Sequence, residues 1–472
     1  MTVSLVSGQP LKRVFASGLF AIGEALRRHQ GTIQRLQWAV VLVYLVLVAV
    51  PAFLPLPGRA AHIYDDLTLF AEFAFWGIWW PFVLLSMILV GRSWCGIFCP
   101  EGSLTEAASL YSRGLAIPRW ITWKGWPFVA FSLTTIYGQM VSVYQYPKPV
   151  LLILGGSTLG AMVVGALYGR NKRVWCHYLC PVNGVFGLLS KLAPVHFAVD
   201  EAAWAASRRP RKSGVRPVNC APLVAIKTMR GASECHMCGR CSDFRGAIAL
   251  ARRSPNQEIL HVAGRAAEPW ETVLILFGLM GIAVGAFHWS VSPWYVAAKQ
   301  MIAEWLIDRD VIWPLSLQPP WWILTDYPNL NDQMTFLDGA VLLAYIGTTA
   351  LAVGSALTLC LWLAARSLGR APWPRFHHLT QSLIPLAGCG VFLGLSAITV
   401  TMLRGEGFEL SFVTPLRVLL LAGAGLWSLV LAWQITGLMT VNLARRVAAI
   451  LPVVAAIAIG VADWVVYFWV WQ

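Results

Sequence analysis

Residues 94–100 read WCGIFCP and residues 175–181 read WCHYLCP, so one signature occurs twice, each time just after a long apolar run. A third cysteine group follows in a polar stretch, where residues 235–241 read CHMCGRC and Cys220 lies upstream. Cysteine thiolates at such spacings are the usual ligands of iron–sulfur clusters. Because each repeated pair ends an apolar run, the pattern predicts an electron-transfer protein built into a membrane.

The composition agrees with a membrane location. Of the 472 residues, 57% are apolar and only 12% are charged, and the mean hydropathy is +0.63. Soluble domains carry about 25% charged residues. Nine apolar runs approach the length of about 20 residues that a spanning helix needs. The expected spans are residues 36–56, 69–90, 126–143, 150–168, 272–289, 340–362, 379–402, 415–436 and 447–469.

These runs predict an all-α polytopic membrane protein with about nine transmembrane helices and a small ferredoxin-like cytoplasmic iron–sulfur module. Residues 1–35 are expected to form an amphipathic cytoplasmic segment, with a basic helix on the membrane surface. Residues 36–200 form a four-helix membrane domain that carries both repeated motifs. Residues 201–271 form the iron–sulfur module. Residues 272–472 form a five-helix C-terminal domain, with residues 293–338 as an outer loop.

The basic residues indicate the orientation. With the N-terminus inside, most of the 36 Lys and Arg residues fall on the inner side, as the positive-inside rule requires. All eight motif cysteines then face the cytoplasm from a bacterial inner membrane, where reducing conditions keep thiols free. The net charge of +14 reflects this topology. Lipid headgroups, and no nucleic acid, are the expected partners of the basic residues.

The repeated motifs predict one shared cluster. Both preceding spans run inward, so an axis along the membrane normal could relate the two units and bring their thiolates together. Each unit alone offers two thiolates, which is too few for a cubane. One [4Fe–4S] cluster is therefore expected on Cys95, Cys99, Cys176 and Cys180.

A second [4Fe–4S] cluster is expected from the third group. The ferredoxin pattern places a fourth cysteine where Arg245 stands, so the nearest spare thiolate must complete the set. The expected ligands are Cys220, Cys235, Cys238 and Cys241. Cys180 could instead complete the 235–241 run, and zinc is the rival metal for four cysteines. The remaining cysteines, Cys360 and Cys389, lie alone in spans and are read as small apolar residues.

At these motifs the chain resembles a known family. The strings SWCGIFCPEG, RVWCHYLCPVNGVFGLLSKLAPVHF and ECHMCGRC are similar to the membrane polyferredoxins of the NapH, NosR and CcoG type, over about residues 35–250. The resemblance implies electron transfer linked to quinol or a periplasmic redox partner, or metal reduction and delivery during enzyme maturation. The outer-loop string PPWWILTDYPNLNDQMTFLDG and the long C-terminal part are similar to the polyferredoxin-like component of Ftr-type ferrous-iron uptake systems.

Four ionisable residues at membrane depth are further candidates: Glu72, His288, Arg417 and Asp463. Such groups are costly in a bilayer and usually serve a pathway, a counter-ion or a proton relay. They predict either an outer-half quinol or proton site, with Glu72 or His288 taking protons, or a structural Arg417–Asp463 pair. A haem would need His62 and His288 as a pair and is not favoured.

The outer loop 293–338 is acidic, which predicts either a docking surface for a basic or metal-bearing periplasmic protein or only the usual shortage of positive charge on the outer side. Its Trp321, Trp322 and Tyr327 are expected along the membrane interface. His177 and His236, inside the cysteine motifs, are read either as donors to cluster sulfur or as solvated filler.

Three functions follow from this sequence. The first is one-electron transfer between a quinol or periplasmic partner and a cytoplasmic carrier, as a component rather than a stand-alone catalyst. The second is a copper or iron reductase or delivery factor for metalloenzyme maturation. The third is a permease, which ranks last because the C-terminal spans show only isolated charges.

Overall fold

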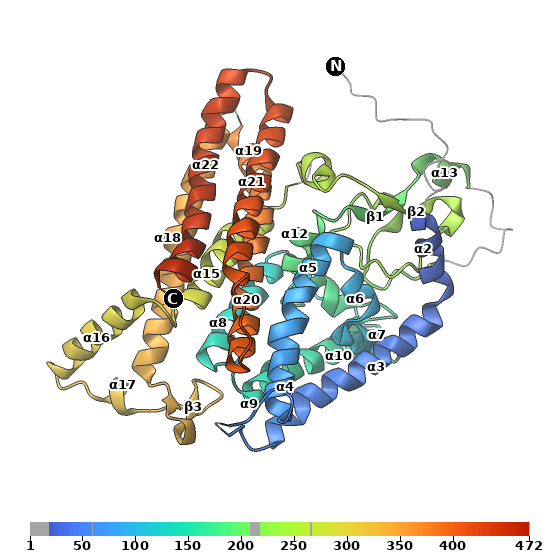
Figure 1. Ribbon diagram of the computed structural model, residues 1–472. Helices are drawn as coiled ribbons and strands as arrows, with labels where there is room; N and C mark the ends of the chain where they lie inside the picture. Colours follow the sequence, from blue (N-terminus) through green and yellow to red (C-terminus); the bar gives the residue numbers. More distant parts are fainter. Residues whose placement is uncertain (1–17, 59, 208–217, 265–266, 370, 472) are drawn as a thin grey trace. The chain divides into compact units, whose positions relative to one another are not determined.

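The computed structural model of the protein describes residues 18–58, 60–207, 218–264, 267–369 and 371–471 (Figure 1). Within these ranges the chain is helical with two short hairpins, which confirms the expected all-α membrane fold. Eight helices in the described part of the chain are long and apolar enough to cross a membrane. They span Gln30–Phe53, Leu67–Val90, Pro147–Tyr168, Pro269–His288, Phe336–Ser367, Pro372–Gly405, Val413–Met439 and Leu443–Val470.

The remaining expected span forms a shorter helix. Helix α8 covers Trp126–Met140, and its 15 residues extend about 22 Å at 1.5 Å per residue. This is less than the hydrocarbon core of about 30 Å. The helix ends before Ser142, whose φ of 50° cannot continue it. The apolar run 126–143 therefore includes a turn that its hydropathy does not reveal.

The chain divides into two compact units. The first unit contains residues 1–44, 85–122 and 158–258, and the second contains residues 45–84, 123–157 and 259–472. Three helices continue from one unit into the other: α3 (Gln30–Ala49), α5 (Trp80–Val90) and α10 (Gly156–Tyr168). The units follow contacts rather than chain order, so the four sequence segments remain a prediction.

The first unit holds short elements around a β-hairpin. Strand β1 (Val195–Val199) pairs antiparallel with β2 (Ile248–Arg252), so that Phe197 faces Leu250. Helix α2 (Gly18–Arg28) packs on β2, and its Leu19 and Leu26 contact the hairpin core. Part of the apolar face expected on the membrane thus packs on protein. The other elements are α6 (Ser93–Ile97), α7 (Pro100–Leu110), α11 (Val174–Tyr178), α12 (Asn183–Ser190), α13 (Glu201–Ala206), η4 (Ile226–Thr228) and η5 (Phe244–Gly246).

The second unit is dominated by long helices. Helices α18 (Phe336–Ser367), α20 (Ile384–Gly405), α21 (Val413–Met439) and α22 (Leu443–Val465) are packed in pairs, with α22 beside both α18 and α21 (Figure 1). Gly281 lets the π-helix η7 (Leu274–Ile282) approach α18, because a Cβ there would lie 2.9 Å from the Ala350 Cα. Close packing of small residues is typical of membrane helices.

Shorter elements complete the second unit. They are η1 (Pro51–Phe53), α4 (Leu67–Glu72), η2 (Phe73–Trp79), α9 (Pro147–Val150), η3 (Leu151–Gly155), η6 (Ile259–Ala263), α14 (Pro269–Val273), α15 (Ala283–His288), α16 (Pro293–Ile307), α17 (Trp313–Ser316), β3 (Asp326–Tyr327), η8 (Pro328–Leu330), β4 (Asp332–Gln333), α19 (Pro372–Thr380), η9 (Gln381–Leu383) and η10 (Val466–Val470). Strands β3 and β4 pair antiparallel.

Candidate metal centre

The two repeated motifs fold alike. Helices α6 and α11 are each five residues long, and each carries the first cysteine of its motif, Cys95 or Cys176, at its third position. Each is preceded by an arginine at the N-cap, Arg92 or Arg173. The repeat is therefore longer than the sequence reading recognised, and runs Arg-x-Trp-Cys-x3-Cys-Pro in both copies.

The second cysteine of each motif lies at the start of a further turn. Cys99 is the N-cap of α7, and its Sγ accepts a hydrogen bond from the Gly102 amide at 3.3 Å. Pro100 fits the first helical turn, where no amide donor is needed. Cys180 likewise accepts from the Val182 amide. Amide donors and a helix N-terminus both favour negative charge on sulfur.

These four cysteines, which we call the motif group, lie together in the first unit. Cys99 is within electrostatic range of Cys95 and Cys176, and Cys180 is within range of Cys99 and Cys176. Burial raises the pKa of Cys176 to about 12 and raises those of Cys99 and Cys180 well above the usual value. Free thiolates are therefore disfavoured here, whereas a coordinated thiol is deprotonated outright.

The third cysteine run forms a tight loop. The Cys235 Sγ accepts from the Met237 amide at 3.4 Å. The backbone then turns through left-handed conformations at Met237 and Gly239, with φ values of 53° and 75°. A Cβ at Gly239 would lie 2.4 Å from the Leu26 Cβ, so glycine also allows α2 to pack here.

Four cysteines also gather around this loop, and we call them the ferredoxin group: Cys220, Cys235, Cys238 and Cys241. Cys241 interacts electrostatically with the other three. Burial raises the pKa of Cys235 to about 12. Cys220, and not Cys180, is thus the fourth cysteine beside the 235–241 run.

The two groups touch through backbone. A Cβ built on Gly96 would lie 2.0 Å from the His236 carbonyl oxygen and 2.9 Å from the Cys238 amide nitrogen. Glycine is therefore the residue that lets the first motif and the ferredoxin loop approach so closely. His236 is 2% exposed and His177 bonds the Pro222 carbonyl at 2.9 Å through Nδ1. The reading of these histidines as solvated filler was wrong.

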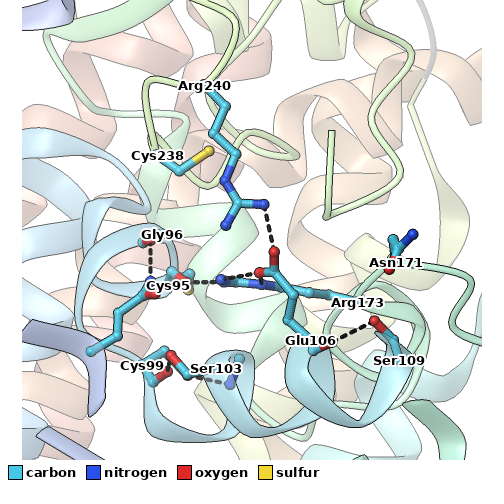
Figure 2. A network of polar contacts seen from close by, with 12 residues as sticks. Cys95, Gly96, Cys99, Ser103, Glu106, Ser109, Asn171, Arg173, Cys238 and Arg240 are labelled. Atoms are coloured by element: carbon cyan, nitrogen blue, oxygen red, sulfur yellow. Dashed lines mark hydrogen bonds and ion pairs between the residues drawn. The ribbon is translucent and has the colours of Figure 1, made fainter. Parts of the chain in front are cut away.

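Charged residues cross between the motifs, as Figure 2 shows for the Arg173 side. The Arg173 guanidinium, 2% exposed, donates to the Cys95 carbonyl at 2.7 Å and to the Glu106 carboxylate at 2.7 Å. In the reverse direction, Arg92 donates to Asn183 Oδ1, two residues beyond the second motif, at 2.6 Å and to the Ser233 carbonyl at 2.9 Å.

Glu106 is the meeting point of two arginines. Its Oε1 accepts from Arg240 at 2.6 Å while its Oε2 accepts from Arg173. Burial alone would raise the pKa of Glu106, but the two guanidinium groups outweigh burial and hold its pKa below the usual value. Glu106, Arg92 and Arg173 were not identified from the sequence as residues of the site. The extended repeat was the one signal that could have found Arg92 and Arg173.

The donor set suits cubane clusters. All eight cysteines are free thiols. Among the described residues, no three Cys, His, Asp or Glu side chains lie close enough to hold a single metal ion. A [4Fe–4S] cluster takes four thiolates, each on its own iron, so its cysteines stand farther apart than those around one zinc ion. Two groups of four cysteines, each buried or partly buried and with backbone amide donors to some of the sulfurs, fit this requirement.

Of the four candidates at membrane depth, Glu72 lines a pocket. The pocket has a volume of about 310 Å³, part of it open to solvent, and is lined by Thr68, Trp76, Tyr144 and Tyr146, among others. The Thr68 Oγ1 is buried without a hydrogen-bond partner. The pocket adjoins the π-helix η2, an irregularity common at functional sites.

The other three candidates pack against the end of the chain. His288 stacks on Tyr467 with ring centroids 5.1 Å apart, and Arg417 lies 4.1 Å above the Phe468 ring. Asp463 Oδ2 is buried without a partner, so within the described residues the expected Arg417–Asp463 pair does not form. None of these three lines the Glu72 pocket. His62 bonds Glu406 at 3.0 Å rather than facing His288.

The loop 293–338 contains two helices and a short hairpin, and some of its acidic residues bond to other parts of the protein. Asp332 accepts from the Tyr146 hydroxyl at 2.6 Å, and Asp338 caps α18 and contacts Lys299. Tyr327 is buried and stacks on Tyr146 with ring centroids 3.6 Å apart, so its expected place at the interface was wrong. The acidic residues that remain exposed are Glu304, Asp308 and Asp310.

Comparison with known proteins agrees with this site. A family model described as a 4Fe-4S binding domain matches residues 73–118 and 152–199, which include one repeated motif each. The chain is 22% identical over 229 residues to the putative electron transport protein YccM of Escherichia coli, covering 43% of this chain and 62% of the relative. No solved structure matches the chain with significance.

Two further relatives match shorter parts of the chain. The methylamine utilization ferredoxin-type protein MauN of Methylorubrum extorquens is 25% identical over 134 residues, covering 25% of this chain and 44% of the relative. The regulatory protein NosR of Pseudomonas aeruginosa is 25% identical over 191 residues, covering 35% of this chain and 25% of the relative. The chain thus spans less than two thirds of each relative. The two matched 4Fe-4S binding segments, each with one repeated motif, make this chain similar to membrane-associated ferredoxin-type electron transport proteins.

Proposed function

We propose that this protein transfers single electrons through two [4Fe–4S] clusters, between a quinol or periplasmic redox partner and the cytoplasmic side of a bacterial inner membrane. The motif group would hold one cluster and the ferredoxin group the other. Such clusters supply one-electron redox chemistry. The chain's own residues bind them through thiolates, exclude water by burial and donate backbone amides to sulfur.

The contact at Gly96 is the observation that carries this proposal. It joins the backbone between Cys95 and Cys99 to the backbone between Cys235 and Cys238, with no side chain in between. Two cluster sites in direct contact suit electron exchange. Two isolated structural metal sites would not need this approach.

The shared first unit also supports the orientation. Cys95 and Cys176 lie in one compact unit, so the chain between α5 and α9 must return across the membrane between them. Helix α8 and its flanking turns supply this return. Both cysteine groups then lie on the side that is rich in Lys and Arg, which is the cytoplasmic side under the positive-inside rule.

Glu72 is the best candidate for a residue that takes protons where a quinol would donate its electrons. Oxidation of a quinol releases protons together with electrons, and a carboxyl in a mostly apolar pocket can accept a proton. Glu72 forms no hydrogen bond or ion pair with any other described residue, and Tyr144 and Trp76 offer flat walls to a ring. Support of iron uptake, with an outer iron-bearing protein as partner, is one process that such electron flow could serve.

Metal content is the first test. Protein purified anaerobically in detergent should contain about eight iron and eight sulfide per chain if both clusters are present. Cys176→Ser and Cys235→Ser should each remove one cluster signal in electron paramagnetic resonance. Cys389→Ser, a cysteine of α20 outside both groups, is the matched control and should retain both signals.

The alternative function has a distinct signature. A preparation rich in copper but free of sulfide would favour a reductase or delivery factor for metalloenzyme maturation. If Cys176→Ser retained a complete first cluster signal in a well-folded protein, the shared motif-group cluster would be rejected.

A further inference from the structure

Two arginines and one carboxylate connect the two cysteine groups. We propose that Glu106, held between Arg173 and Arg240, is a charged bridge that lowers the reduction potentials of both groups. The proposal rests on the function above, because it assumes that both groups carry clusters.

Both arginines bond to the Glu106 carboxylate. Each Glu106 oxygen receives a different arginine: Oε1 takes Arg240 at 2.6 Å and Oε2 takes Arg173 at 2.7 Å (Figure 2). The Arg173 side chain is 2% exposed and that of Arg240 is 26% exposed. Charge-assisted bonds in such partly buried geometry are the strong class of hydrogen bond.

Each arginine also reaches a cysteine group. Arg173 donates to the Cys95 carbonyl and is within electrostatic range of Cys176 and Cys238. Arg240 lies in the chain between Cys238 and Cys241, and it is within electrostatic range of Cys220. One guanidinium therefore acts mainly on the motif group and the other on the ferredoxin group, while Glu106 touches both guanidinium groups.

The electrostatic consequence has a definite sign. Reduction adds negative charge to a cluster, so a nearby arginine makes reduction easier and a nearby carboxylate makes it harder. Because Arg173 is buried and Glu106 and Arg240 are only partly exposed, these effects are screened less than they would be between fully exposed charges. Glu106 offsets part of the positive charge on both sides, and its loss should make both groups easier to reduce.

The test uses Glu106→Gln, which removes the charge and keeps one acceptor oxygen. In a potentiometric titration of detergent-solubilised protein, followed by electron paramagnetic resonance, the reduced-to-oxidised ratio at fixed potential should rise about tenfold for both clusters. That change corresponds to 59 mV for one electron. Glu201→Gln, on the exposed start of α13 in the same unit, is the matched control and should leave both potentials unchanged.

A second variant keeps the test decisive if Glu106→Gln loses its clusters. Arg240→Gln removes the more exposed arginine, and it should shift the ferredoxin-group potential in the opposite direction by a similar factor. Retained clusters with unchanged potentials in either variant would overturn the bridge, even if thermal stability fell, because a purely structural role moves stability alone. Absence of clusters in the unmodified protein would instead refute the proposed function.

Discussion

Gly96→Ala tests the close approach of the first motif to the loop of residues 235–241. The added Cβ would lie 2.0 Å from the His236 carbonyl oxygen, whereas an ordinary carbon–oxygen contact is about 3.4 Å. The two loops must therefore separate by more than about 1 Å. The Cys238 amide nitrogen and Cα, at 2.9 Å and 3.1 Å, are backbone atoms as well, so no side-chain rotation relieves the clash.

The expected cost follows from two opposing terms. Overpacking of this kind costs about 1–3 kcal/mol, and sometimes more. Alanine in the short helix α6 regains up to about 1 kcal/mol relative to glycine. We expect Gly96→Ala to be destabilising by about 1–3 kcal/mol overall, because a backbone-to-backbone clash lies at the upper end of the range. The larger separation should also weaken the magnetic interaction between the two clusters.

The assay compares Gly96→Ala with Gly187→Ala in α12. A Cβ at Gly187 would lie 3.5 Å from the Ser233 carbonyl oxygen, an ordinary contact in the same unit. Thermal unfolding in detergent, monitored by tryptophan fluorescence, gives stability, and paramagnetic line shape reports the interaction between clusters. If both variants unfold at the same temperature and give the same line shape, the reasoning about Gly96 is refuted.

Three other predictions concern parts of the fold away from this contact. Glu258→Gln should lower the free energy of unfolding by about 3–5 kcal/mol, because it leaves buried Arg253 without its 2.5 Å ion pair. Thermal or denaturant unfolding measures this loss, and the exposed control Glu201→Gln should change the free energy by no more than about 0.5 kcal/mol. Burial lowers the pKa of His196 to about 4, so the unfolded chain binds a proton that the folded chain resists, and stability should fall as the pH drops from about 6.5 to 4. His196→Phe should flatten this part of the curve by up to about 3 kcal/mol, and an unchanged slope would contradict the assignment. Asp338→Asn weakens the capping box of α18 and should cost about 1 kcal/mol, seen as faster hydrogen exchange in its first turn.

Much of the prediction of fold and site rested on the apolar runs and the cysteine spacing. Both are local signals: a spanning helix needs a long apolar run, and a Cys-Pro step favours a helix start. The predicted bounds of a span differ from the structure where its helix continues beyond the apolar run. The run 340–362 continues as α18 from Phe336 to Ser367, because Thr335 and Asp338 form a capping box ahead of the apolar stretch.

Partners that are distant in sequence could not be predicted. Glu106 lies in an ordinary amphipathic segment, and its arginines are 67 and 134 residues away. Tyr327 has the amphipathic ring of an interface residue, yet Tyr146 provides a stacking partner within the protein. Arg417 and Asp463 have opposite charges, but the aromatic face of Phe468 takes the guanidinium. In each case a tertiary contact outweighed the preference of the residue type.

Arg92 precedes the first motif and bonds to Asn183 beyond the second, while Arg173 precedes the second motif and bonds to Cys95 in the first. This mutual bonding has a consequence for the biogenesis of the protein. A ribosome adding about 5–20 residues per second releases the first pair of thiols seconds before the second pair and its arginine exist. During that interval the nascent chain exposes two of the four cysteines of the motif group, which are open to oxidation and to binding of other metals. The proposed motif-group cluster could therefore be inserted only after translation has passed Cys180, and a chain truncated before the second motif would lack half of its ligands.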